Sequence, residues 1–141
     1  HACKAIIKKE KIVPQVVFTL EPTSPFRSIE TIQKCLKIYK SNNVDSVVSV
    51  AESDKCYGRI INNKFLYNIK NQKRRRQDRE KIFYESGTIY ATCYKTLLKY
   101  NSVLGKKIYP LIVSNIEAID INNSIDFLLA EAIINKKKLN K

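Results

Sequence analysis

The residues of this chain best suited to chemistry lie close together in "LEPTSPFRS", residues 20–28. This stretch carries the carboxylate of Glu21, the hydroxyls of Thr23 and Ser24, and the cation of Arg27. Hydroxyls and backbone N–H groups at the start of a helix bind anions, and an arginine beside them adds positive charge. An ordinary strand-to-helix turn with a hydroxyl cap uses the same residue types. From the residues alone, both interpretations stay open.

A second group of reactive side chains is the basic cluster "KRRRQDR", residues 73–79. Such a cluster is typical of a solvated charged loop, of a nucleic-acid patch, or of guanidinium forks that bind carboxylates or phosphates. The sequence pattern by itself does not choose among the three.

The scarcity of histidine excludes several kinds of catalysis. His1 is the only histidine, so Ser–His and Cys–His nucleophiles and His-dependent metal sites are excluded. The four cysteines (Cys3, Cys35, Cys56 and Cys93) are scattered singly, without zinc-site spacing, and are expected to be reduced thiols. Any chemistry must therefore use carboxylates, amides, hydroxyls and cations.

Composition predicts one globular domain over residues 1–141, with 44% hydrophobic and 28% charged residues. The formal charge of +13 implies an anionic partner, although part of the excess lies in the basic tail "KKKLNK", residues 136–141, which is expected to be solvated. No apolar run reaches the roughly 18 residues that span a bilayer, and no signal-peptide pattern opens the chain. We therefore expect a cytoplasmic protein with no membrane insertion.

Short apolar runs alternate with helical patterns along the chain. Strands are predicted over residues 16–20, 45–51, 87–93 and 107–113, with a hairpin over 58–67 that turns at Asn62-Asn63. Helices are predicted before residue 16, from Ile29 with Ser28 as N-cap, over 95–100, and from about Ser124. This alternation predicts an α/β fold with a doubly wound, mostly parallel sheet, interrupted by a charged excursion over residues 57–86. Ligands of such sheets lie beyond the carboxyl ends of the strands, which is where "EPTSP" falls.

Four stretches, in order along the chain, resemble the motifs of one enzyme family. "LEPTSPFR" (20–27) resembles L-Q-P-T-S-P-L-R, and "VVSVAE" (47–52) matches a V-S-V strand. "RRRQD" through "ESGTIY" (74–90) resembles R-R-Q-D followed by N-G-A-I-Y, and "AIDINNSIDFLLAE" (118–131) resembles S-I-D-I-D-T-x-x-D-F-x-x-A-E. These are motifs of the acylneuraminate cytidylyltransferases, or CMP-sialic acid synthetases, which have a Rossmann-like nucleotidyltransferase fold.

The resemblance implies a reaction and a set of residues. CTP and an acidic nine-carbon sugar would give a CMP-sugar, a precursor of cell-surface glycans, and pyrophosphate, with Mg²⁺ as cofactor in a homodimer. Arg76 and Gln77 match the pair that reaches the acid sugar from the partner subunit, and Arg59 falls about where the family has a lysine for the same pocket. Catalytic roles then fall to Asp120 and Arg27. The remaining substrate-binding residues would be Glu21, Pro22, Thr23, Ser24, Ser86, Tyr90, Val103 and Leu104, although a core role is equally open for Tyr90, Val103 and Leu104.

Asp120 is the implied magnesium ligand, together with Asn122. By its position before the last predicted helix, Asp120 also fits a turn or helix-capping residue. Because it follows a short apolar approach, we expect its carboxylate at the same sheet edge as "EPTSP".

The chain departs from the family pattern at three of these positions. Glu21 replaces the usual Gln, Ser86 replaces Asn, and Asn122 replaces the second Asp of D-I-D. The changes at Glu21 and Ser86 point toward a sialic-acid-like relative such as legionaminic acid.

The glycine-containing loop that holds the CTP phosphates in the family has no counterpart here. We therefore expect an N-terminally truncated domain, with this loop upstream of His1. Two alternatives remain: a noncatalytic dimerising remnant, and a basic nucleic-acid-binding domain. The second lacks the aromatic-glycine, zinc-finger and helix-turn-helix patterns of such domains, so we expect no nucleic-acid partner.

Overall fold

The computed structural model describes residues 2–71 and 73–139 of the chain. His1 lies outside the described residues, and so do the side chains of residues 137–141. The expected solvated basic tail consists mainly of these last residues. Among the described residues, no helix combines the length and apolar character needed to cross a bilayer.

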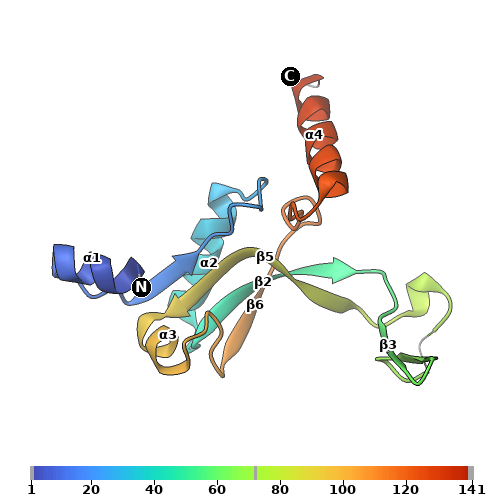
Figure 1. Ribbon diagram of the computed structural model, residues 1–141, viewed down its shortest axis with the longest axis horizontal. Coiled ribbons are helices and arrows are strands. Elements are labelled where there is room, and N and C mark those ends of the chain that lie inside the picture. Colours follow the sequence, from blue (N-terminus) through green and yellow to red (C-terminus); the bar gives the residue numbers. More distant parts are fainter. Residues whose placement is uncertain (1, 72, 140–141) are drawn as a thin grey trace.

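A four-stranded mixed sheet forms the centre of the molecule, with strand order β1-β5-β2-β6 (Figure 1). The strands are β1 (Val16–Thr19), β2 (Ser46–Ser53), β5 (Ile82–Cys93) and β6 (Ile108–Ile112). β6 is parallel to β2, whereas β5 is antiparallel to both β1 and β2, so β1, β2 and β6 share one direction. The predicted α/β fold is confirmed. β5 runs in the opposite direction because the chain returns to it through the excursion rather than through a crossover helix, which a parallel neighbour requires.

The α-helices in the described part of the chain are α1 (Ala2–Glu10), α2 (Ile29–Ser41), α3 (Tyr94–Tyr100) and α4 (Ser124–Leu139). α2 begins where predicted, because the Ser28 side chain accepts a hydrogen bond from the backbone N–H of Thr31 at 3.1 Å. It packs on the sheet through Cys35, which is fully buried with Val47, Ile89, Ala91 and Leu111. α4 projects away from the sheet (Figure 1).

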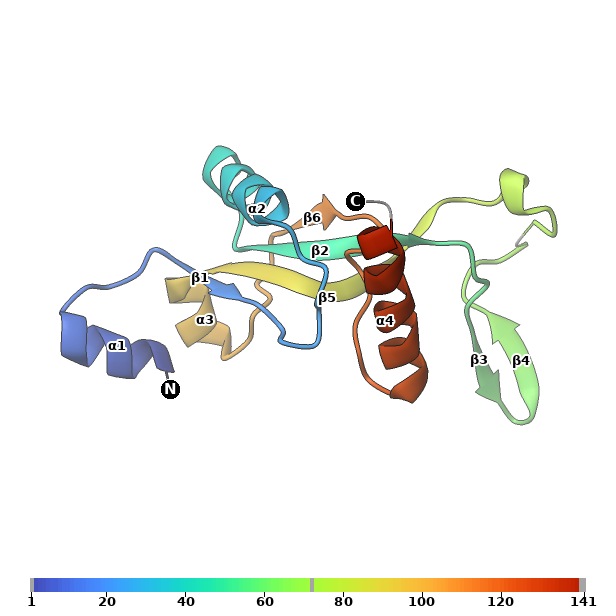
Figure 2. The ribbon, with the colours of Figure 1, turned by 90° about the horizontal axis from the view of Figure 1, so that it is seen from above.

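The hairpin β3 (Gly58–Ile61) and β4 (Lys64–Tyr67) forms a separate two-stranded sheet, as predicted. Asn62 and Asn63 turn it, with φ of 49° and 60°. Two consecutive left-handed residues are the signature of a type I′ turn, which asparagine tolerates. The hairpin and the loop after it, which contains the short 3₁₀ helix η1 (Arg76–Asp78), extend beyond the end of the four-stranded sheet (Figure 2).

β5 is longer than the predicted strand 87–93 and contains a bulge. Val48 pairs with Tyr90 but Val50 pairs with Glu85, so the four residues 86–89 of β5 lie opposite the single residue Ser49 of β2. Gly87 lies in the bulge with φ of +71°, a conformation that glycine adopts without strain. The first part of β5 was not predicted because its apolar residues Ile82, Phe83 and Tyr84 directly follow a highly charged stretch; their pairing with β2 continues the strand.

Candidate active site

The turn that follows β1 is fastened to β5 by the side chain of Arg27. Its Nε donates to the carbonyl of Thr88 at 2.5 Å, and its Nη2 donates to the carbonyl of Glu21 at 2.7 Å. The guanidinium thus holds the turn in place through two main-chain acceptors. The catalytic role expected for Arg27 stays a prediction.

The same turn lies directly beside Asp120. The backbone N–H of Ile121 donates to the carbonyl of Thr23 at 2.9 Å. This hydrogen bond joins the Asp120 segment to the turn, two segments that were expected to lie at the same sheet edge. Ser24 is 4% exposed, and its hydroxyl oxygen is buried without a hydrogen-bond partner among the described residues. Pro22 lies on the exposed side of this turn.

Asp120 has one oxygen available for a ligand. Its Oδ2 accepts a hydrogen bond from Asn122 Nδ2 at 2.8 Å, while its Oδ1 is buried and has no partner among the described residues. The alternative interpretation was that Asp120 caps α4, but other residues cap this helix. Asn123 Oδ1 accepts a hydrogen bond from the backbone N–H of Asp126 at 3.1 Å, and Asp126 Oδ2 accepts one from the backbone N–H of Asn123 at 3.1 Å. This reciprocal pair is a capping box that the spacing of Asn123 and Asp126 could have revealed.

An orphan carboxylate oxygen is a suitable donor for a hard cation such as Mg²⁺. The described residues contain no group of three His, Cys, Asp or Glu side chains that could hold a metal by themselves. Asp120 therefore fits a magnesium site of the kind completed by substrate phosphates. Asn122 presents its amide nitrogen to Asp120, which makes it an orienting neighbour of the carboxylate in this arrangement.

Tyr90 lies among three carboxylates. Its hydroxyl donates to Glu85 Oε1 at 2.5 Å. Burial raises the pKa of Tyr90 well above its usual range, and the hydrogen bond to Glu85 and the charges of Glu85, Glu21 and Asp120 raise it further. Tyr90 is thus a neutral phenol whose proton is committed to Glu85. Glu85 stands directly before the motif at residues 86–90 and matches none of its positions, so no role was predicted for it.

Ser86 is buried within the bulge of β5 rather than open to solvent. Its hydroxyl lies 3.1 Å from that of Thr88, which donates to the carbonyl of Glu117 at 2.9 Å. The expected contact of Ser86 with the sugar stays a prediction.

Glu117 ties the bulge region to the start of α2, and sequence reasoning missed it. Its Oε1 accepts hydrogen bonds from Ser28 Oγ at 2.9 Å and from Thr31 Oγ1 at 2.5 Å. Burial raises the pKa of Glu117, but the hydrogen bonds from Thr31 and Ser28 outweigh burial, so the pKa lies below its usual value. The carboxylate also lies at a helix N-terminus, where negative charge is favoured.

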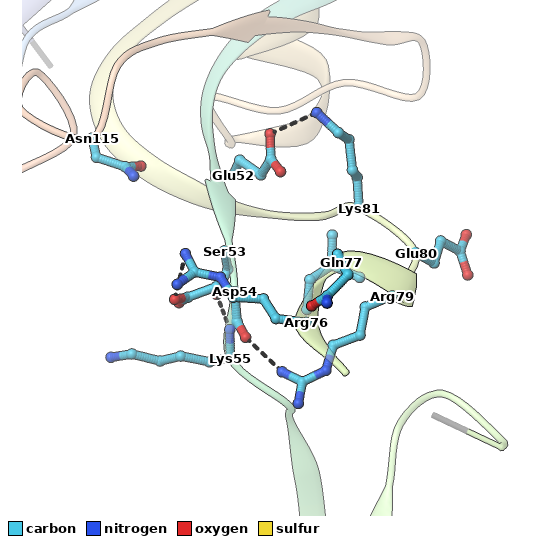
Figure 3. A pocket seen from close by; sticks show the side chains of 11 residues that line it. Glu52, Ser53, Asp54, Lys55, Arg76, Gln77, Arg79, Glu80, Lys81 and Asn115 are labelled. Carbon is cyan, nitrogen blue, oxygen red and sulfur yellow. Dashed lines mark hydrogen bonds and ion pairs between the residues drawn. The ribbon is translucent and has the colours of Figure 1, made fainter. Parts of the chain in front are cut away.

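Arg76 and Gln77 lie in a different place, a pocket of about 550 Å³ at the carboxyl end of β2 (Figure 3). Arg76 Nη2 contacts Asp54 Oδ2 at 2.7 Å. The residues that line this pocket do not include Glu21, Tyr90 or Asp120. The structure therefore does not bring the two groups of predicted residues into one cavity of a single chain. The expected contribution of Arg76 and Gln77 across a subunit interface stays a prediction.

Three further predicted residues lie outside both places. Arg59 is exposed on β3. The carbonyl of Val103 accepts from Thr92 Oγ1 at 2.5 Å, and Thr92 is two residues beyond Tyr90, on the same face of β5. The backbone N–H of Leu104 binds Ser102 Oγ at 3.0 Å. Val103 thus contacts the residue that follows Tyr90 on the same face of β5, whereas Arg59 lies on the hairpin.

The sequence of the chain is similar to those of known enzymes. No protein-family model matches the chain. It is 29% identical over 128 residues to the CMP-N,N'-diacetyllegionaminic acid synthase of Legionella pneumophila, covering 84% of this chain and 53% of that protein. It is also 26% identical over 114 residues to an N-acylneuraminate cytidylyltransferase of Streptococcus agalactiae, covering 77% of this chain and 28% of that protein. The chain is a homologue of these cytidylyltransferases. It spans about half the length of the first relative and less of the second.

A solved structure shares the fold. The 4-diphosphocytidyl-2C-methyl-D-erythritol synthase of Anaerococcus prevotii superimposes with a TM-score of 0.64 at 15% identity, covering 87% of this chain and 58% of that one. The likeness shows that this chain shares the α/β fold of that structure.

Proposed function

We propose that this cytidylyltransferase homologue carries part of the active site for transfer of CMP from CTP to a nonulosonic acid, with release of pyrophosphate. The observation that carries the proposal is the backbone hydrogen bond from Ile121 to Thr23 at 2.9 Å. It places the turn after β1 against Asp120, whose buried Oδ1 has no partner among the described residues.

In the proposed reaction, the anomeric hydroxyl of the sugar attacks the α-phosphate of CTP. Such a transfer depends on alignment and charge neutralisation more than on a protein nucleophile. Arg27 holds the turn rigid, and Asp120 with Asn122 beside it would hold Mg²⁺. When bound, the ion neutralises charge on the phosphates. Tyr90, hydrogen-bonded to Glu85, offers an incoming sugar an acceptor oxygen rather than a proton.

The proposed sugar is an acid of the legionaminic type rather than sialic acid itself. Its carboxylate suits the guanidinium of Arg76, with Gln77 adjacent. Glu21 supplies a carboxylate where a sialic-acid enzyme of this kind would present an amide, so it accepts hydrogen bonds without donating any. The sequence identity of 29% to a CMP-N,N'-diacetyllegionaminic acid synthase supports the choice of this sugar.

We also propose a homodimer formed through the excursion 57–86. Its apolar side chains are widely exposed: Tyr57 43%, Ile60 77%, Phe65 52%, Leu66 45%, Tyr67 47% and Phe83 44%. Exposed apolar surface on this scale marks an interaction site. A dimer here would give Arg76 and Gln77 a route to the turn of the second copy.

The test is release of pyrophosphate from CTP, measured with this chain and with any longer polypeptide that contains it. We expect release only when Mg²⁺ and N,N'-diacetyllegionaminic acid or N-acetylneuraminic acid are both present, and faster release with the first acid. Reactions without sugar control for CTP hydrolysis. Tight RNA binding with a steep salt dependence and no pyrophosphate release would favour the nucleic-acid interpretation.

A further inference from the structure

The pocket at the end of β2 contains a carboxylate that already binds Arg76 (Figure 3). Arg76 Nη2 lies 2.7 Å from Asp54 Oδ2, and the two side chains are 73% and 48% exposed. The pair is therefore reachable from solvent. An anionic ligand that binds Nη2 of this guanidinium must compete with Asp54.

Arg79 holds the loop by hydrogen bonds that do not involve the side chain of Asp54. Arg79 Nε donates to the carbonyl of Lys73 at 2.9 Å and its Nη2 to the carbonyl of Arg74 at 2.7 Å. Its Nη1 donates to the main-chain carbonyl of Asp54 at 3.0 Å. All three acceptors are backbone groups, so they survive a change in the Asp54 side chain. The carboxylate of Asp54 is thus free for another role.

We propose that Asp54 is a competing carboxylate, which occupies Arg76 in the free protein, is displaced by the carboxylate of the acid sugar and so lowers the affinity for that sugar. The inference rests on the proposed function for the identity of its ligand. The exchange replaces one charge-assisted contact with another and leaves no unpaired buried charge, because both groups are exposed.

The geometry of the Arg76–Asp54 ion pair explains why a sugar carboxylate can displace Asp54. Arg76 and Asp54 are joined through one guanidinium nitrogen and one carboxylate oxygen. A guanidinium fork binds a planar carboxylate best through two parallel N–H···O bonds. A free carboxylate that can adopt the two-bond arrangement therefore outcompetes Asp54. A neutral sugar makes only uncharged contacts and does not displace Asp54, so the ion pair weakens binding of the acid and leaves binding of a neutral sugar unchanged.

The same pocket offers a matched control. Lys81 Nζ lies 3.1 Å from Glu52 Oε2, with side chains 73% and 50% exposed. Glu52→Gln removes the same charge from the same pocket as Asp54→Asn, but leaves the partner of Arg76 in place. A general change in the electrostatic field affects both variants alike, whereas carboxylate exchange affects only Asp54→Asn.

The experiment measures KM for N-acetylneuraminic acid, for its methyl ester and for CTP in the wild type and both variants. Exposed ion pairs contribute little, so Asp54→Asn is expected to lower KM for the acid about two- to fivefold. KM for the ester and for CTP stays the same, and Glu52→Gln changes none of the three. An equal fall in both variants, or no fall in Asp54→Asn, overturns the inference.

A second measurement does not require turnover. The guanidinium Nε–H signal of Arg76, assigned with Arg76→Lys, is followed by NMR while N-acetylneuraminic acid is added. The signal is expected to titrate with a Kd two- to fivefold lower in Asp54→Asn than in the wild type. If this happens without any pyrophosphate release, the proposed function fails and the exchange stands. Equal Kd values refute the exchange even if the protein is active.

Discussion

Replacing Arg27 by alanine tests whether this residue is a structural anchor. The change removes two hydrogen bonds, to the carbonyls of Thr88 at 2.5 Å and Glu21 at 2.7 Å. Hydrogen bonds from a charged donor contribute about 1.5–3 kcal/mol each, and the lower value suits a half-buried group, so the expected loss is about 3 kcal/mol. For a domain of this size, that lowers Tm by about 10 °C.

The measurement is urea unfolding followed by circular dichroism, with Arg74→Ala as control because, among the described residues, Arg74 is bonded through its main-chain carbonyl. Arg27→Lys adds a second comparison: it keeps the charge, but one ammonium does not reproduce the planar fork between two carbonyls, so it should recover less than half of the loss. An Arg27→Ala protein that unfolds within about 0.5 kcal/mol of the wild type, the range of ordinary surface changes, would refute the anchor. Lost turnover in such a protein would assign Arg27 to the substrate.

Four further expectations concern the site and its support. Because the pKa of Glu117 is lowered in the folded protein, its stabilisation is present above the ordinary pKa of 4.5 and is lost as pH falls below it; the stability gap between wild type and Glu117→Gln should therefore be widest near neutral pH and close in acid. Arg76→Ala should weaken sugar binding by on the order of 2 kcal/mol with little effect on CTP affinity. An equal loss of sugar affinity in Arg75→Ala would indicate that the positive charge of the whole cluster, and no single contact, binds the sugar. Asp120→Asn should abolish turnover and leave Tm nearly unchanged, since its Oδ1 has no partner among the described residues; near-normal rates at limiting magnesium would end the metal assignment. Gly87→Ala should destabilise by about 1–2 kcal/mol through its φ of +71° alone, because a Cβ there meets no atom within 4 Å, and Gly87→Asn should recover part of the loss in the same urea assay.

Local sequence determined the elements whose signals are short-range. Ser28 caps α2 because its hydroxyl reaches an N–H only three residues ahead, and Asn62-Asn63 turns the hairpin because asparagine tolerates positive φ. The apolar runs of β1, β2 and β6 identified three strands of the sheet. The short apolar run before Asp120 also predicted that its carboxylate would lie at the same sheet edge as the turn after β1, and the Ile121–Thr23 hydrogen bond joins these two segments.

Tertiary structure alone decided the contacts between segments far apart in the chain. Arg27 binds a carbonyl 61 residues away, and Glu117 reaches a hydroxyl 89 residues away, so no local pattern encodes either pairing. The beginning of β5 and its bulge depend on the edge that β2 presents, and the Asp54–Arg76 ion pair depends on how the loop folds back onto that strand. In each case the sequence supplies a side chain able to bond, but its partner is determined only when the folded backbone brings the two segments together.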